Sequence, residues 1–213
     1  MPSDAWQFWY TLKEGTVEPE IPKLEELLRQ NSALKILDFG CGAGRHLVYF
    51  AKRGFEVYGF DASETAIKRA REVLKSENLF ADLRVWDMMK PLPYEDGFFD
   101  AVLVVRVMHH TYMDNIKRIA KEIDRVLKKG GLLFLQVPFS KEEILGWKQK
   151  GGNLEEPEPR TYVYSEGEEK GIPHHIFTKK ELLGLFQNYH IEEIHCATEH
   201  HTGFCLIGRK INQ

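Results

Sequence analysis

The most informative stretch of the sequence is Lys35-Ile36-Leu37-Asp38-Phe39-Gly40-Cys41-Gly42-Ala43-Gly44-Arg45-His46. Its first half is apolar enough to form a short buried strand, and its second half leads into a helix. Three glycines at every second position stand between the two. Glycine lets the backbone approach a ligand closely and adopt positive φ, and a helix N-terminus presents unpaired N–H groups. The stretch therefore predicts a ligand-binding turn between a strand and a helix.

Outward from this turn, apolar strands alternate with helical segments from Ile36 to Val137. Such alternation is typical of βαβ units, which build a parallel sheet covered by helices. Two further strands, residues 191–197 and 203–210, are joined by a short link and predict an antiparallel hairpin. The strands expected in the parallel part are residues 35–39, 55–60, 83–86, 98–105 and 132–137.

The helices show their own start and stop signals. An amphipathic helix follows Pro22 and ends near Asn31, and Ser63 is the expected N-cap of a helix over residues 64–76. A helix over residues 115–127 is expected to stop at two lysines and two glycines, residues 128–131. The last helix is expected to begin at a capping box, residues 178–181.

Polar residues and glycines follow the predicted strand ends. Ligands of parallel sheets bind beyond the carboxyl ends of the strands. Gly40, Asp61, Asp87 and Arg106 each stand at such an end, so we expect them to meet at one edge. Asp61 follows Gly44 by 17 positions (61 − 44), close to the roughly 20 residues between a glycine turn and a ribose-binding acid. A carboxylate there can accept hydrogen bonds from ribose hydroxyls.

With Asp38 two residues before the first glycine, this set resembles the first motifs of the class I S-adenosylmethionine-dependent methyltransferases, in their small-molecule branch. The resemblance runs from about residue 34 to 137, and the final hairpin fits it. It implies an α/β fold: a three-layer Rossmann-like sandwich with a seven-stranded, mostly parallel sheet and an antiparallel C-terminal hairpin. It also implies S-adenosyl-L-methionine as cofactor, with S-adenosyl-L-homocysteine as product.

The resemblance also implies a role for each cofactor residue. The glycine turn would lie under the methionine part, Asp38 would hold its amino group and Asp61 the ribose hydroxyls. Asp87 would bind the adenine amino group, with the backbone of Met88 at the ring edge. The cofactor-binding residues expected on this basis are Asp38, Gly40, Cys41, Gly42, Gly44, Asp61, Ala62, Asp87, Met88, Val105 and Arg106.

The acceptor is predicted to be a small molecule. After the fourth strand the chain has Val105-Arg106-Val107-Met108, where nucleic-acid and protein nitrogen methyltransferases of this fold often carry an Asn/Asp-Pro-Pro-aromatic tetrapeptide. Methyl transfer mainly needs alignment, although some acceptors need a general base. His110 and His174 are the expected catalytic residues.

Two segments that the core does not explain are expected to cap the acceptor site. They are the aromatic N-terminus, within an N-terminal lid and helix over residues 1–31, and an insertion over residues 138–177. The glutamates of the insertion, residues 155, 156, 158, 166, 168 and 169, are expected to form its solvated outer face. The acceptor-lining residues expected are Tyr10, Arg106, His110, Tyr162, His174 and His175.

Composition limits the function classes. The 213 residues are 43% hydrophobic and suit a single methyltransferase domain over residues 1–213. A net charge of -3 and a pI near 6.3 give no nucleic-acid footprint, and no apolar run predicts a membrane span. The N-terminus lacks signal-peptide features, so a cytoplasmic protein is expected. Cys41, Cys196 and Cys205 are expected to be reduced, and their spacing predicts no metal site.

Two alternatives of other classes stay open. A nicotinamide-dependent oxidoreductase would share the sheet, but its G-x-G-x-x-G spacing is missing and Asp38 would repel a pyrophosphate. A non-catalytic S-adenosylmethionine-binding protein would need almost the same residues as an enzyme. The sequence does not identify the acceptor or the oligomeric state.

Overall fold

The computed structural model describes residues 17–140, 153–167, 169–197 and 203–211. Its main sheet has the strand order β3-β2-β1-β4-β5-β10-β9, and only β10 runs antiparallel to its neighbours. This confirms the predicted seven-stranded, mostly parallel sheet with its C-terminal hairpin. The strands are β1 (Lys35–Phe39), β2 (Glu56–Asp61), β3 (Asp82–Val85), β4 (Phe99–Val105), β5 (Leu127–Pro138), β9 (Tyr189–Ala197) and β10 (Gly203–Lys210).

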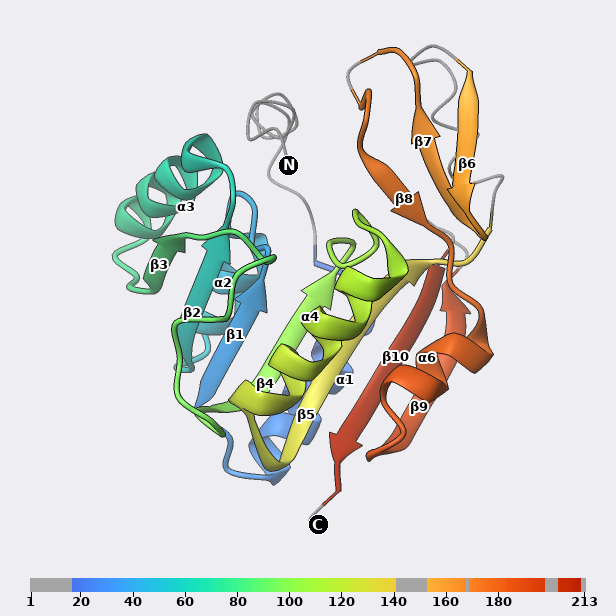
Figure 1. The fold of residues 1–213 in the computed structure, drawn as a ribbon. Helices are drawn as coiled ribbons and strands as arrows, with labels where there is room; N and C mark the ends of the chain where they lie inside the picture. The colour runs from blue at the N-terminus through green and yellow to red at the C-terminus, as the bar shows by residue number, and fades with distance from the viewer. Residues whose placement is uncertain (1–16, 141–152, 168, 198–202, 212–213) are drawn as a thin grey trace.

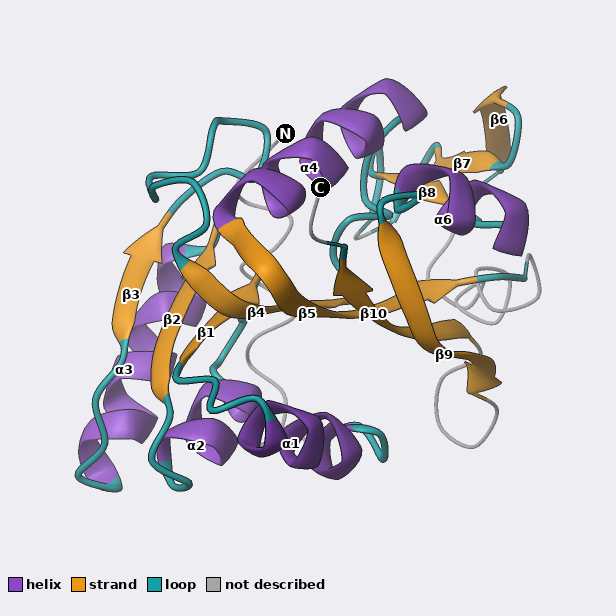
Figure 2. Ribbon diagram, turned by 90° about the horizontal axis from the view of Figure 1, so that it is seen from below, coloured by secondary structure: helices purple, strands orange, loops and turns teal. Residues whose placement is uncertain are grey.

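Helices cover both faces of this sheet and make three layers (Figure 2). On one face lie α1 (Ile21–Gln30), α2 (Arg45–Ala51) and α3 (Glu64–Ser76). The other face carries α4 (Met113–Val126) and α6 (Lys179–Leu185). The central strand β4 serves both layers, because Ala101 and Leu103 join one core cluster while Val102 and Val104 join the other. Burial on both faces explains why β4 is apolar except at Asp100 near its start.

The helix signals are confirmed at three places. Helix α1 is the expected N-terminal helix and buries Ile21, Leu24 and Leu28 against the sheet, whereas the lid expected before it falls in residues 1–16, outside the described residues. Ser63 accepts a hydrogen bond from the Ala66 amide as the N-cap of α3. The capping box of α6 is present with both of its hydrogen bonds between Thr178 and Glu181.

The expected glycine stop after α4 takes another form. Strand β5 starts directly at Leu127, and its register with β4 jumps from Phe99↔Leu127 to Ala101↔Leu132. Gly130, with φ of 75°, lies within this irregular stretch. The glycines therefore bend the strand instead of preceding it.

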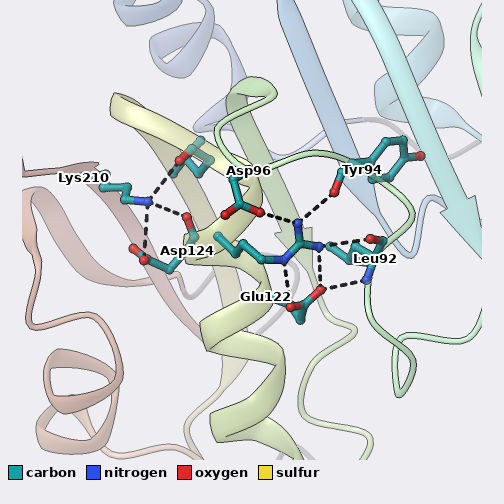
Figure 3. Close-up of polar contacts among 8 residues, drawn as sticks. Leu92, Tyr94, Asp96, Glu122, Asp124 and Lys210 are labelled. Carbon is teal, nitrogen blue, oxygen red and sulfur yellow. Dashed lines mark hydrogen bonds and ion pairs between the residues drawn. The ribbon is translucent and has the colours of Figure 1, made fainter.

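Polar contacts hold the last turn of α4 in place (Figure 3). The Arg125 guanidinium donates to the backbone oxygens of Leu92 at 3.0 Å and Tyr94 at 2.8 Å, and it pairs with Asp96 and Glu122. The Lys210 ammonium of β10 donates to the backbone oxygen of Leu127 at 3.1 Å. These contacts lie at the amino edge of β4 and leave the carboxyl edge to the candidate site.

The insertion forms a second, three-stranded antiparallel sheet beyond the carboxyl edge of the main sheet (Figure 1). Its strands are β6 (Leu154–Glu158), β7 (Thr161–Tyr164) and β8 (Pro173–His175). The sequence pattern predicts a strand over residues 160–164, which is confirmed as β7, but it predicts no strand at β6 or β8. The insertion is bound to the core by backbone hydrogen bonds from His175 to His109 at 2.8 Å and from Phe177 to Pro138 at 3.0 Å.

The expectation that the insertion glutamates face solvent was wrong at two of the described positions, and Glu168 lies outside the described residues. Glu169 is only 4% exposed. Glu158 accepts hydrogen bonds from the Met113 amide and the Thr161 hydroxyl, each at 2.8 Å. Because α4 has no side-chain N-cap of its own, Glu158 supplies one from the insertion.

Two remaining expectations concern membranes and thiols. Among the described residues, no helix combines the length and apolar character that crossing a membrane requires. The three cysteines are free thiols, and Cys196 stands opposite Phe204 in the terminal hairpin, not opposite Cys205.

Candidate cofactor and acceptor site

The glycine turn has the backbone conformation that its sequence predicts. Gly40, Gly42 and Gly44 have φ of 70°, 54° and 88°. A Cβ built on Gly40 would lie 2.4 Å from the side chain of Val107, so the turn also packs closely against the segment after β4. Both constraints favour glycine, because an L side chain is strained at positive φ and has no room at Gly40.

Asp61 lies against this turn at the end of β2. Its Oδ2 accepts a hydrogen bond from the Gly42 amide at 3.0 Å, and its Oδ1 accepts one from the Ser63 amide at 2.9 Å. The side chain is 6% exposed. These two bonds fix the orientation of the carboxylate beside the turn. Ala62 links Asp61 to Ser63.

Asp38 belongs to a buried charged cluster that sequence reasoning missed. The Nδ1 of His46 lies 3.6 Å from the Oδ2 of Asp38, and its Nε2 contacts Glu18, which also pairs with Arg45. Burial lowers the pKa of His46, but the two carboxylates outweigh it and raise the pKa from 6.5 to about 9. His46 is therefore a cation between two acids. An acid just before the glycine turn could have suggested a basic partner, although Glu18 gives no local signal.

The other expected cofactor residues follow their strands. Asp87 lies after β3, where its Oδ1 accepts a hydrogen bond from the Met89 amide at 2.9 Å and shapes the backbone around Met88. Val105 ends β4. Arg106 then adopts φ of 56°, which is uncommon for a residue with a side chain, while its amide donates to the Gln136 oxygen at 2.9 Å. Strain at this position is typical of a functional site.

A histidine cluster stands next to this edge. His109 and His110 follow β4, and His174 comes from β8 of the insertion. The ring centroids of His110 and His174 are 5.0 Å apart, and those of His109 and His110 are 3.8 Å apart. The structure thus brings together the two predicted catalytic residues and adds His109, another histidine that the sequence offers as a candidate general base.

Burial sets the charge of these rings. It lowers the pKa of His109 well below its usual value, and the neighbouring His110 and Arg106 lower it further. The pKa of His110 is lowered in the same way by burial, His174 and Arg106. Both rings are therefore neutral at pH 7 and have a nitrogen lone pair to offer.

The remaining acceptor-lining predictions have different outcomes. Tyr162 is the cross-strand partner of His174, so both lie on one face of the insertion sheet. His175 points to the opposite face, where its Nδ1 lies 2.8 Å from the Thr161 hydroxyl. His175 therefore does not fit the predicted acceptor-lining set, because neighbouring residues of a strand alternate between faces. Tyr10 lies outside the described residues.

Comparisons with known proteins agree with this arrangement. The profile of the family described as "Methyltransferase domain" matches residues 37–135. An uncharacterized methyltransferase of Synechocystis sp. is 35% identical over 101 residues, which cover 47% of this chain and 45% of that protein. The chain spans about half the length of the curated relatives it matches.

Two solved structures share the fold. A methyltransferase from Methanosarcina mazei, described as S-adenosylmethionine-dependent, has a TM-score of 0.72 at 23% identity, covering 93% of this chain and 100% of that chain. The Burkholderia thailandensis 1,6-didemethyltoxoflavin-N1-methyltransferase, with bound 1,6-didemethyltoxoflavin and S-adenosylhomocysteine, has a TM-score of 0.68 at 18% identity. It is matched over 90% of this chain and 77% of that chain. Over residues 37–135, which carry the glycine turn and the acid after β2, the chain matches the methyltransferase-domain family, and its fold is that of S-adenosylmethionine-dependent methyltransferases.

Proposed function

We propose that this protein transfers a methyl group from S-adenosyl-L-methionine to a small-molecule acceptor. The observation that carries the proposal is the meeting of three features at one sheet edge: the glycine turn, the Asp61 carboxylate bonded to it, and the histidine cluster closed over by the insertion. The first two suit the cofactor. The third suits an acceptor beside the cofactor's methyl group.

The cofactor residues have complementary tasks. Asp61 would accept hydrogen bonds from the ribose hydroxyls, and the backbone around Met88 would contact the adenine that Asp87 binds. Asp38 would hold the amino group of the methionine part, with the turn beneath it. The buried His46 supports this role, because its Nδ1 lies 3.6 Å from the Asp38 carboxylate and orients it from the other side. When bound, S-adenosyl-L-methionine supplies a methyl group already activated on a sulfonium.

The burial and charge of the site indicate which class of acceptor it would bind. The names of relatives refer to targets as different as ubiquinone biosynthesis and ribosomal RNA, so they do not select one. The acceptor side here is closed by buried residues, with His174 fully buried and Tyr162 8% exposed. The chain carries a net charge of -3, whereas nucleic-acid sites are basic. A compact, uncharged or cationic small molecule fits these features best.

His110 and His174 would orient the acceptor's nucleophilic atom. A neutral imidazole accepts a hydrogen bond from a hydroxyl, thiol or amine and takes its proton as the new bond to the methyl carbon forms. Because the pKa of His110 is low, it is a weak base. It therefore suits an acceptor whose own group is acidic, such as a phenol or a thiol, better than an aliphatic alcohol.

Transfer of an isotope-labelled methyl group to fractionated metabolites tests the proposal. We expect the wild-type protein to label a small-molecule fraction, His110→Ala to lower the rate by about 10²-fold or more, and His190→Ala, an exposed substitution on β9, to leave the rate unchanged. Binding of S-adenosylhomocysteine without any transfer would favour the non-catalytic alternative. Binding of a nicotinamide dinucleotide in its place would favour the oxidoreductase.

A further inference from the structure

We propose that His109, His110 and His174 together bind one divalent transition-metal ion of the class represented by Zn²⁺. One ring nitrogen from each residue lies within 4.8 Å of the other two. Histidine nitrogens bind zinc at about 2.0–2.1 Å, so two ligands of one tetrahedral ion lie about 3.4 Å apart. The ring nitrogens need to close by no more than about 1.4 Å to reach that geometry.

His109 gives a second reason to expect a ligand. It is 0% exposed, and neither ring nitrogen has a hydrogen-bond partner among the described residues. Buried polar groups in native proteins nearly always have a partner. An apolar side chain would fill the same space at lower cost, so packing alone does not account for an imidazole here. A metal ion would supply the missing partner.

Glu169 completes the arrangement. This residue of the insertion is 4% exposed, and its Oε2 lies 3.6 Å from the Nε2 of His174. A carboxylate behind a metal-bound histidine fixes the ring and raises its basicity. We assign Glu169 this outer role, so three protein ligands remain and one coordination position is open, as in catalytic zinc sites. When the ion is bound, the lone pairs of His110 and His174 serve as its ligands, so the role of these two rings as proton acceptors applies to the metal-free protein only. That the acceptor occupies the open position rests on the proposed function, whereas binding of the ion does not.

A bound ion would fix the insertion to the core. His109 and His110 follow β4, whereas His174 comes from β8, and the His175 amide already donates to the His109 oxygen at 2.8 Å. An ion would therefore join two segments that are 64 residues apart (174 − 110). This separation is also why the sequence spacing predicted no metal site.

A second group, Glu20, His195 and Cys205, also has ligand atoms within 4.8 Å of one another. There the Nε2 of His195 already hydrogen-bonds Glu20 at 2.9 Å, and its Nδ1 lies 3.1 Å from a carboxylate oxygen of Glu193. The group is also less buried. We therefore use it as the internal control.

Titration of the full-length, chelator-treated protein with Co²⁺, without cofactor, tests the proposal. We expect one ion per chain, visible ligand-field bands without thiolate charge transfer, and displacement by Zn²⁺. His109→Ala and His174→Ala should each weaken binding by about 100-fold or more, and Glu169→Gln by about 10–100-fold. His195→Ala and His190→Ala should leave binding unchanged.

Failure of the folded wild-type protein to bind Co²⁺ or Zn²⁺ below millimolar concentration would overturn the proposal. Loss of binding in His195→Ala with retention in His174→Ala would also do so. Circular dichroism identifies a variant that does not fold, and Glu169→Gln then still reports on the site. Calorimetry with S-adenosylhomocysteine on the metal-free protein shows separately whether the proposed function fails.

Discussion

The imidazole of His46 places its Nδ1 3.6 Å from the Oδ2 of Asp38, and both side chains are almost completely buried. Its other nitrogen contacts Glu18, which precedes α1. A cation held between two acids orients Asp38 beneath the glycine turn. It also connects the start of the described chain to the proposed cofactor site.

The first prediction concerns stability and pH. The folded pKa of His46, about 9, is above its ordinary value of 6.5. Its stabilisation is therefore complete below about pH 6.5 and is lost as the pH rises through about 9. We expect the free energy of unfolding to fall over this window by on the order of 2–3 kcal/mol. In denaturant titrations, the free energy of unfolding of His46→Gln should change little across this pH window.

Glu18 gives the same cluster a limit in acid. Burial raises its pKa, but His46 and Arg45 outweigh this and lower it below 4.5. Glu18 therefore stabilises the folded state above about pH 4.5, and this stabilisation is lost as the pH falls further.

If the free energy of unfolding of His46→Gln falls as steeply between pH 6.5 and 9 as that of the wild type, another group is responsible for the pH dependence.

The second prediction concerns Gly40. Gly40→Ala adds a Cβ that would lie 2.4 Å from Val107 while φ is 70°. We expect the affinity for S-adenosylhomocysteine to fall at least about 10-fold, because the turn must shift. Gly54→Ala is the matched control, since Gly54 has φ of 85° and nothing within 4 Å of the added carbon.

A second-site variant separates crowding from backbone strain at Gly40. Adding Val107→Ala removes the contacted methyl groups, so the double variant should recover part of the affinity in calorimetry. If Gly40→Ala and Gly54→Ala bind the ligand equally well, the turn does not lie at the cofactor.

The third prediction concerns the insertion. Glu158 accepts from the Met113 amide at 2.8 Å and so caps α4 from β6. Glu158→Ala removes this bond and the one from Thr161, and should cost about 1–2 kcal/mol. Hydrogen exchange should show faster opening of β7 and β8, with Glu155→Ala, an exposed change on β6, as control. Equal exchange in both variants would mean that the insertion is held by other contacts.

Much of the fold could be predicted because its signals are local. The glycine turn, the Ser63 cap, the capping box at Thr178 and the apolar strand β4 each follow from neighbouring residues. Strands β6 and β8 were missed because neither shows a clean alternation; β6 is mostly acidic and β8 has three residues.

The candidate site was predictable where strand ends fix it and missed where distant segments meet. Asp61 is placed by the end of β2, whereas Glu18 reaches His46 from 28 residues away. His175 was assigned together with His174, although alternation along β8 sends the two rings to opposite faces. Local spacing carries no information on such long-range contacts.

The most direct test of the central claim is calorimetric titration of the protein with S-adenosylhomocysteine. Binding should be in the micromolar range, near -8 kcal/mol. Asp61→Asn should weaken it by about 1.5–3 kcal/mol, or roughly 10- to 150-fold, because the ribose hydroxyls lose a charged acceptor. Asp96→Asn, in the exposed loop before β4, should bind like wild type. Two results would contradict the assignment of the glycine turn and Asp61 as the cofactor site. They are the absence of binding to folded protein up to millimolar ligand, and equal affinity in all three proteins.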